Sequence, residues 1–299
     1  MSVQKCTSAY PFREYRREFM YVLKSLTRIL NALYFFQTEG PDSDEEDDII
    51  KPTDNLLLVG HVESDASILE VYIYNHDEGS LYVHHDILLP WFPLCIEWLS
   101  HDPSDPNPGN LCALGGMDPV IQVWDLDIEN CLEPAFKLGK KPNKKKKTKR
   151  VGHKDAVLDL SWNKNFTHVL ASGSADKTVL LWDLDQGTPH TKLSYFDDKV
   201  QCVSFHPLEA QTLLSGACDG RARVTDCRAP DAHRAWSLGP EIERAVWDTH
   251  NPFCFAVSTH WFFLFFFFII SKHRCFSAKH RCLFNIDEYR SSLIGGILP

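Results

Sequence analysis

Short apolar runs separated by turn residues dominate the chain between residues 54 and 259. The runs Val120–Trp124 and Val179–Trp182 are β-branched and aromatic, and Gly, Asp and Pro residues bound them. Such runs are typical of buried strands, whereas an amphipathic helix would repeat its apolar residues every three or four positions. Helical spacing is absent from this region. The pattern therefore predicts an all-β fold for it.

One of these apolar segments recurs along the chain and ends each time in an aromatic residue. The aromatic positions are Trp98, Trp162, Phe205 and Trp247. Trp162 and Phe205 are 43 residues apart, and Phe205 and Trp247 are 42 apart. A repeat with a constant period indicates the fold more firmly than local propensity does.

A second pattern follows the first three copies of that segment. It is a turn Asp, then a short strand, then an aromatic residue or Thr before a second Asp, and it occurs at Asp118 with Trp124 and Asp125, at Asp176 with Trp182 and Asp183, and at Asp219 with Thr225 and Asp226. Asp176 and Asp219 are again 43 residues apart, but Asp118 and Asp176 are 58 apart. The extra 15 residues fall between Leu138 and Gly152, which indicates an insertion in a loop between repeats.

A period near 43, with a Gly-His pair 29 residues before a Trp-Asp pair, resembles the WD repeat, in which each propeller blade has four short strands. We expect blades at residues 54–92, 93–138, 151–196 and 197–238, followed by one further strand that ends near Ser258. The first blade is divergent, with three strands predicted before residue 90. The expected fold class is an incomplete WD-repeat β-propeller of about four blades plus one strand.

The WD-repeat resemblance implies a buried hydrogen-bond chain inside a blade. Its members would be Asp176, His153, Ser172 and Trp182. Each such group costs about 1–3 kcal/mol if it is buried without a partner. In the next blade Asp219 and Ser215 remain, but Thr225 replaces the Trp and no Gly-His pair precedes it, so that blade is expected to rely on apolar packing. The other repeat positions are expected to be structural: Trp98, Asp118, Trp124, Asp125, Trp162, Asp183, Ser215, Asp219 and Trp247.

The same Asp, His and Ser residue types occur in hydrolase triads. A triad serine sits at an exposed turn, whereas Ser172 lies in the middle of a predicted strand and its residue types recur at the blade spacing. The sequence has no nucleophile elbow, phosphate-binding loop or zinc-protease motif. We therefore predict that the chain is not an enzyme and has no cofactor, no metal and no small-molecule substrate.

Charge is distributed unevenly along this chain of net charge -9. The loop at residues 139–151 contains eight basic residues: Lys140, Lys141, Lys144, Lys145, Lys146, Lys147, Lys149 and Arg150. The rest of the chain therefore has 23 basic residues against 40 acidic ones. Such a tract serves as a nuclear localisation signal, as a contact for ribosomal RNA, or as an inert solvated loop. The ten cysteines form no C-x-x-C pair, which indicates a reducing compartment.

The two ends of the chain depart from the repeat. Residues 1–53 are predicted to form an amphipathic helix and an acidic linker. After Thr259 a Phe-rich run replaces the expected Asp and Gly turn, so residues 260–299 are predicted to be an irregular, aberrant tail from a translated intron or an alternative final exon. The run Trp261–Ile270 has about half the length that a membrane-spanning helix needs, and no membrane association is expected. The tail residues His273, Cys275, His280 and Cys282 fit no structural zinc spacing and are interpreted as a chance cluster.

Three unbroken stretches outside the general repeat pattern resemble the periodic tryptophan protein 1 family. They are Tyr82–Leu89, Val120–Asp127 and Asp155–Lys164, and the resemblance covers about residues 42–259. It implies a nuclear and nucleolar scaffold in ribosome biogenesis, in ribosomal RNA transcription or processing, with pre-ribosome or chromatin proteins as partners. One alternative is a chromatin- or RNA-associated factor that uses the basic loop. Another is a truncated product without function.

Overall fold

The computed structural model describes residue 50 and residues 54–269, apart from 64–65, 130, 143–144, 146, 148, 230, 249–250, 252 and 260–261. All regular elements in this part are strands, which form five antiparallel sheets. The predicted all-β class is therefore confirmed. The helix predicted within residues 1–53 lies outside the described residues, as does the tail after residue 269. No helix in the described part is long and apolar enough to cross a membrane.

The first sheet is a meander of three long strands. They are β1 (Asp54–Glu63), β2 (Ala66–Asn75) and β3 (Ser80–Leu89). Along β2 the buried positions alternate with partly exposed ones, as expected for a strand that covers a core with one face. The divergent first blade predicted for residues 54–92 thus has three strands.

The next three sheets have four strands each and match the predicted blades. The first is β4 (Pro93–Leu99), β5 (Leu111–Gly116), β6 (Ile121–Asp125) and β7 (Phe136–Leu138). The second is β8 (Val157–Trp162), β9 (Val169–Ser174), β10 (Val179–Asp183) and β11 (Thr188–Leu193). The third is β12 (Val200–Phe205), β13 (Thr212–Ala217), β14 (Arg221–Asp226) and β15 (His233–Ser237).

The fifth sheet corrects two expectations about the end of the repeat region. It contains β16 (Ile242–Trp247), β17 (Cys254–Thr259) and β18 (Phe262–Ile269), whereas one strand and then irregular chain were predicted. The Phe-rich run forms β18, which pairs antiparallel with β17. Aromatic residues favour strands, and β17 would otherwise present an unpaired edge. The Phe-rich run therefore forms a strand, although the WD-repeat sequence pattern ends at Thr259.

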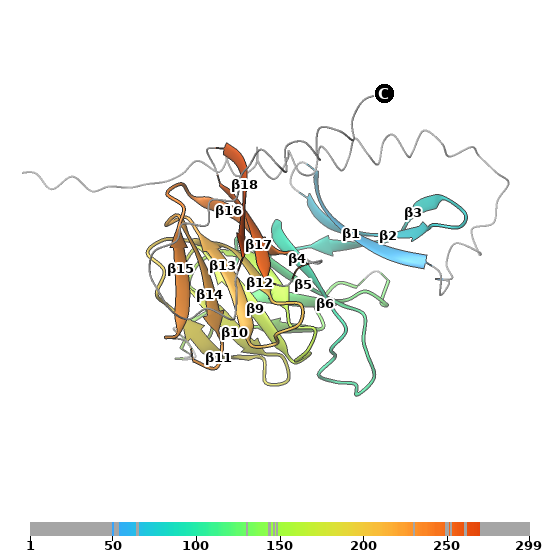
Figure 1. Ribbon diagram of the computed structural model, residues 1–299. Helices are drawn as coiled ribbons and strands as arrows, with labels where there is room; N and C mark the ends of the chain where they lie inside the picture. Colours follow the sequence, from blue (N-terminus) through green and yellow to red (C-terminus); the bar gives the residue numbers. More distant parts are fainter. Residues whose placement is uncertain are drawn as a thin grey trace, which may run out of the picture.

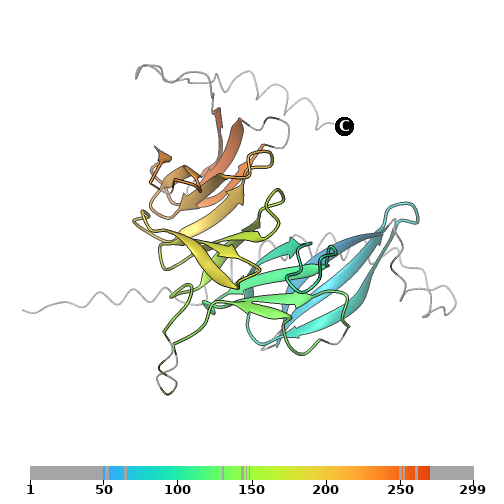
Figure 2. The ribbon, with the colours of Figure 1, turned by 90° about the horizontal axis from the view of Figure 1, so that it is seen from below.

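The five sheets follow one another in an arc. Figure 2 shows them fanned side by side, from β1–β3 in blue to β16–β18 in orange and red. Figure 1 shows the long strands β1 to β3 beside the sheet that begins with β4. The first strands of the last four sheets are neighbours in order, so β4, β8, β12 and β16 form the inner side of the arc. The arc does not close into a ring within the described residues.

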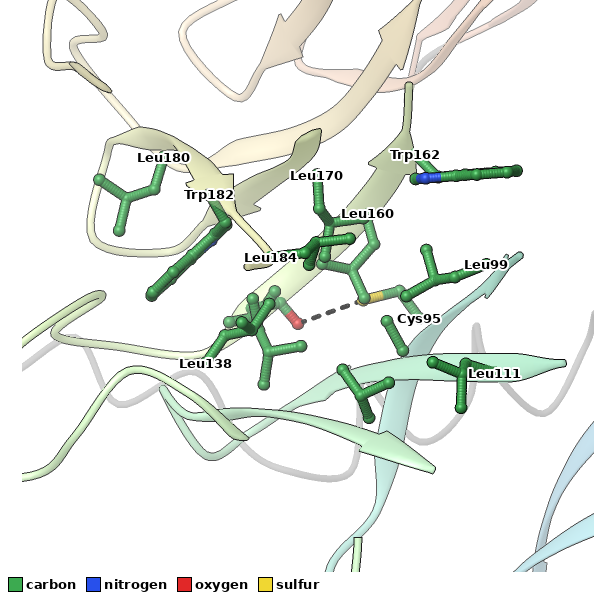
Figure 3. Packing of buried hydrophobic residues seen from close by; sticks show 14 residues of the cluster. Cys95, Leu99, Leu111, Leu138, Leu160, Trp162, Leu170, Leu180, Trp182 and Leu184 are labelled. Atoms are coloured by element: carbon green, nitrogen blue, oxygen red, sulfur yellow. Dashed lines mark hydrogen bonds between the residues drawn. The ribbon is translucent and has the colours of Figure 1, made fainter. Parts of the chain in front are cut away.

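Apolar side chains fill the spaces between adjacent blades. Figure 3 shows the cluster between the second and third sheets, where Trp182, Leu160 and Leu99 lie among other buried residues. The Cys95 Sγ atom is 3.8 Å from the Val157 carbonyl oxygen, which joins β4 to β8. Burial raises the pKa of the Cys95 thiol well above its ordinary value, so this group is an apolar packing residue.

One glycine in each repeat allows this close packing. A Cβ atom on Gly115 would lie 2.7 Å from a Val157 methyl group in the next blade. At the equivalent position, a Cβ on Gly216 would lie 2.6 Å from a methyl group of Ile242. The glycine three residues before the turn Asp therefore lets the first strand of the following blade approach.

Candidate functional site

The structure brings the four residues of the predicted hydrogen-bond chain together in the third sheet. Trp182 Nε1 donates to Ser172 Oγ at 2.7 Å, and Ser172 Oγ lies 2.7 Å from His153 Nε2. His153 Nδ1 lies 3.2 Å from both carboxylate oxygens of Asp176. A consistent set of donors has the Ser172 hydroxyl donating to His153 Nε2 and His153 Nδ1 donating to Asp176. Thr178, which the sequence analysis missed, donates from Oγ1 to Asp176 at 2.6 Å.

Three members of the tetrad are buried, and the Asp176 side chain is 7% exposed. Ser172 and Trp182 have no exposed surface, and His153 is 1% exposed. Burial alone would raise the pKa of Asp176, but hydrogen bonds and charge from His153, with further bonds from Thr178 and the Lys154 amide, hold it well below its ordinary value. A nucleophile must reach its substrate, so the enclosed Ser172 hydroxyl is placed to join strands and not to attack a carbonyl group.

The neck of the basic loop packs directly on this tetrad. Lys140 and Val151 form an isolated antiparallel bridge that closes the loop. Gly139 and Gly152 flank the bridge with φ of 91° and 98°, and a Cβ atom on Gly152 would lie 2.7 Å from the Trp182 ring. The insertion predicted between Leu138 and Gly152 is therefore held at its base, on one end of the blade.

The fourth sheet replaces the tetrad with a buried ion pair, which corrects the expectation of purely apolar packing. Arg223 Nη2 donates to Asp219 Oδ2 at 2.6 Å, and Nη1 donates to Oδ1 at 3.1 Å. The two side chains are 2% and 5% exposed. The guanidinium carbon lies 4.9 Å from the Phe196 ring centroid and 5.9 Å from that of Tyr195. The Tyr195 hydroxyl in turn bonds Thr225, which occupies the missing Trp position.

The second sheet has neither arrangement. Trp124 is buried, and its Nε1 has no hydrogen-bond partner among the described residues. Leu114, four residues before Asp118, stands where Ser172 stands in the next blade, so no hydroxyl is present to accept this bond. Asp118 forms an ion pair with Lys141 of the basic loop, with 2.5 Å between Nζ and Oδ2.

Polar side chains on the inner strands cross-link successive blades, and the sequence analysis did not identify them. Glu97 accepts a hydrogen bond from the Trp162 amide at 2.8 Å, and Ser161 accepts one from the Phe205 amide at 3.0 Å. Both acceptors immediately precede a repeat aromatic residue, which is the sequence signal that would have found them. Asp159 accepts from the Val203 amide at 2.8 Å and from Arg244 Nη1 at 3.0 Å.

A cavity of about 250 Å³ lies among these inner strands, and its lining includes Glu97, Trp162, Lys164, His206 and Arg244. Burial raises the pKa of Glu97 to about 7, against the hydrogen bond from the Trp162 amide, which lowers it. Both signs of charge therefore line the cavity. Within the described residues, no group of three or more His, Cys, Asp or Glu could hold a metal ion.

The remaining predicted positions lie at or near strand ends, except Ser215 in the middle of β13. Trp162 Nε1 donates to the Thr167 carbonyl at 2.8 Å, and Trp247 Nε1 donates to the Ser204 carbonyl at 3.0 Å. Trp98 donates to Asn110 at 2.9 Å and is 46% exposed. The other predicted positions have simpler contacts: Asp125 accepts from the Asp127 amide, Asp183 accepts from the Asp185 and Gln186 amides, and Ser215 donates to the Arg223 carbonyl. The tail residues His273, Cys275, His280 and Cys282, which we interpret from the sequence as a chance cluster, lie outside the described residues.

Comparisons with known proteins agree with this architecture. Residues 144–183, which span the third sheet up to its Trp-Asp pair, match the family described as WD domain, G-beta repeat. The chain is 49% identical over 255 residues to the periodic tryptophan protein 1 homolog of Drosophila melanogaster, which covers 84% of this chain and 56% of that protein. It is 35% identical over 261 residues to periodic tryptophan protein 1 of Saccharomyces cerevisiae, covering 70% of this chain and 45% of that protein.

A more distant relative is the ribosome biogenesis protein WDR12 homolog of Oryza sativa subsp. japonica, 30% identical over 112 residues, which cover 38% of this chain and 22% of that protein. The chain spans about half the length of the periodic tryptophan proteins that it matches. The chain contains a WD repeat over residues 144–183, and along most of its length it resembles the periodic tryptophan protein 1 homologues.

Proposed function

We propose that this chain is a nuclear and nucleolar scaffold that functions in ribosome biogenesis by binding other proteins, without catalysis. The resemblance to periodic tryptophan protein 1 homologues, and to a protein named for ribosome biogenesis, supports the process. Pre-ribosome or chromatin components are the proposed partners.

The observation that carries the non-catalytic part of the proposal is the burial of Ser172 and His153 within the tetrad. The residue types that are able to act in hydrolysis, Asp176, His153 and Ser172, are bonded to one another inside a blade. Their geometry fixes the strands and the turn, and so keeps the connecting loops in one arrangement. Preorganised loops lower the conformational cost of binding a partner, which is how a scaffold obtains affinity.

The basic loop is proposed as the nuclear import signal. Its neck is fixed by the Lys140–Val151 bridge, and Arg150 Nη1 donates to the His153 carbonyl at 3.0 Å. The two ends of the loop are thus anchored at one end of a blade. Replacing Lys144–Lys147 by alanine in a fluorescently tagged full chain should shift the protein from the nucleus to the cytoplasm.

A matched control replaces four dispersed, exposed lysines by alanine: Lys137, Lys154, Lys164 and Lys192. This control removes the same charge but leaves the tract intact, so it should stay nuclear. An unchanged nuclear signal for the tract variant would reject the import role. The scaffold role is tested separately, by co-purification with pre-ribosomal proteins after nuclease digestion and a wash at high salt.

The second candidate function is direct binding of ribosomal RNA or chromatin, which the eight basic residues of the loop favour. Contacts to phosphate weaken as salt rises, with a slope of about -0.7 per contact for single strands. Full engagement of the loop would therefore give a slope approaching about -6 when log K is plotted against log salt. Association that survives high salt and nuclease treatment favours the protein scaffold, whereas a steep slope favours the nucleic-acid factor.

A further inference from the structure

The loops at the two ends of the blades differ in charge. One end, which we call the acidic face, holds the loops that join the first strand to the second and the third to the fourth: residues 100–110, 126–135, 163–168, 184–187, 206–211, 227–232 and 248–253. These loops contain nine carboxylates and two bases, Lys164 and Arg228, which gives a net charge of -7.

The opposite end, which we call the basic face, has the reverse balance. Its loops are residues 117–120, 139–156, 175–178, 194–199, 218–220 and 238–241. Their described residues contain seven carboxylates and nine bases, a net charge of +2. The molecule therefore has an electrostatic polarity along its strands, and a charged segment in solution is attracted preferentially to one end.

More of the exposed large apolar side chains lie in the loops of the acidic face than in those of the basic face. Its loops present Ile128, Leu132, Phe166, Leu208 and Phe253, and the exposed Trp98 lies at the adjoining end of β4. Leu132 is 84% exposed and Leu208 is 72% exposed. In the loops of the basic face, Met117 is the exposed large apolar residue among those described. Such side chains are available to bury the apolar residues of a partner.

Hydrogen bonds between loops hold this face in shape. Asn163 Nδ2 donates to the Ala210 carbonyl at 2.7 Å, which joins the third and fourth sheets. His101 Nε2 lies 2.7 Å from Asp185 Oδ1, which joins the second and third. The cavity lined by Trp162 and His206 lies where these loops meet the inner strands, and it gives the face a depression for an anchoring side chain. Because the cavity has charges of both signs, the loops and not the cavity determine the sign of the partner.

We propose that the acidic face is the docking surface for a basic polypeptide segment that carries apolar side chains. Its carboxylates attract the cationic residues of the segment, and the exposed Leu, Ile, Phe and Trp side chains bury its apolar residues. The inference rests on the proposed binding function, because it names the class of partner that the scaffold takes. Its test uses purified components, so its outcome does not depend on nuclear import or on co-purification from cells.

The test titrates the full chain against a fluorescein-labelled twelve-residue peptide that repeats lysine, leucine, lysine and serine, with fluorescence anisotropy as the readout. Saturable binding is expected. Binding should weaken by about tenfold or more when the peptide leucines become serine, since each buried leucine contributes about 1.5–3 kcal/mol and a tenfold loss corresponds to only 1.4 kcal/mol. It should vanish when the peptide lysines become glutamate.

Two variants of the protein locate the site. The first combines Leu132→Ser with Leu208→Ser, and the second combines Glu129→Lys with Glu133→Lys; all four positions are exposed, so neither variant is expected to disturb folding. Both should weaken binding by about tenfold. The single controls Met117→Ser and Glu241→Lys, on the basic face, should bind as the unmodified chain does, and the single variants Leu132→Ser and Glu129→Lys give the comparison of equal size. Thermal unfolding of each variant shows whether it is folded. Absence of saturable binding, or equal loss in the controls, would overturn the proposal.

Discussion

Replacing Arg223 by methionine tests how a blade without the tetrad is held together. Methionine matches the length of the aliphatic part of the arginine side chain but removes both hydrogen bonds to Asp219. The Asp219 side chain is only 5% exposed, so its carboxylate then lacks a charged partner in a buried position. Breaking a buried pair in this way costs about 3–5 kcal/mol. The Asp219 carboxylate keeps hydrogen bonds from the Asp197 amide at 3.2 Å and the Arg221 amide at 3.0 Å, which places the expected cost near the lower end, at about 3 kcal/mol.

The local effect is measured by hydrogen exchange of the β13 and β14 amides, because the loss should appear first in this blade. Urea unfolding followed by tryptophan fluorescence gives the overall change in the free energy of unfolding. The double variant Asp219→Asn with Arg223→Met should be less destabilised than the sum of the two single variants, by about 2 kcal/mol, because no charge is then left unpaired. The matched control is Arg221→Met, whose partner Asp197 is 71% exposed and whose removal should cost less than about 1 kcal/mol.

Acid adds an independent check on the same pair. Burial alone would raise the pKa of Asp219, but the hydrogen bonds and charge of Arg223 hold it below its ordinary value. A carboxylate with a lowered pKa in the folded state contributes stability above the unfolded pKa of 3.8, and this contribution is lost as the pH falls through the folded value. Arg223→Met should therefore reduce stability strongly at pH 7 and less below pH 4. A loss under 1 kcal/mol at pH 7, or one equal at both pH values, would refute the reasoning.

Three further predictions concern the other polar groups. Ser172→Ala should lower the free energy of unfolding by about 2–3 kcal/mol, since it leaves the Trp182 N–H and the His153 Nε2 without a partner, and a loss in urea unfolding below 0.5 kcal/mol would contradict this. Asp176→Asn should remove the part of the acid sensitivity that develops below pH 3.8, because the pKa of Asp176 is lowered in the folded state; an unchanged acid limb in circular dichroism would count against it. Burial raises the pKa of Glu97 from 4.5 to about 7, so folding stability falls as the pH rises between these values. Glu97→Gln should therefore stabilise the protein at pH 8, by on the order of 2 kcal/mol, but not at pH 4. Equal shifts in thermal unfolding at both pH values would exclude this assignment.

The repeat spacing predicted the blades because four-stranded meanders need turns at constant intervals. It placed the strands of residues 93–138, 151–196 and 197–238, and it brought His153, Ser172, Asp176 and Trp182 to one blade. It did not predict β18, because that strand follows from an apolar run beside an open edge and not from repeat letters. The repeat spacing also missed Arg223. A guanidinium can be buried here because Asp219 pairs with it and the rings of Tyr195 and Phe196 pack against it, and only the fold brings these groups together.

The turn Asp is what the three full blades have in common. In each of them one carboxylate oxygen accepts the amide two residues later, at 3.0 Å for Asp118, 3.1 Å for Asp176 and 3.0 Å for Asp219. Asp residues commonly stabilise turns in this way, which explains why this position recurs even where the Trp, Ser and His do not. The recurring Asp therefore stabilises the turn in each blade, whereas the side chain that pairs with its carboxylate differs between blades.

That partner differs in kind from blade to blade: Lys141 from the basic loop, the buried His153, and the buried Arg223. The Lys141 side chain is 61% exposed, so its pair with Asp118 contributes little to stability, about 1 kcal/mol or less. The His153 and Arg223 arrangements lock their blades, whereas the Asp118 arrangement leaves its lysine able to exchange partners. The second blade is thus the one whose turn Asp pairs with a charged side chain of the basic loop, and an anion bound by that loop would compete with Asp118 for Lys141.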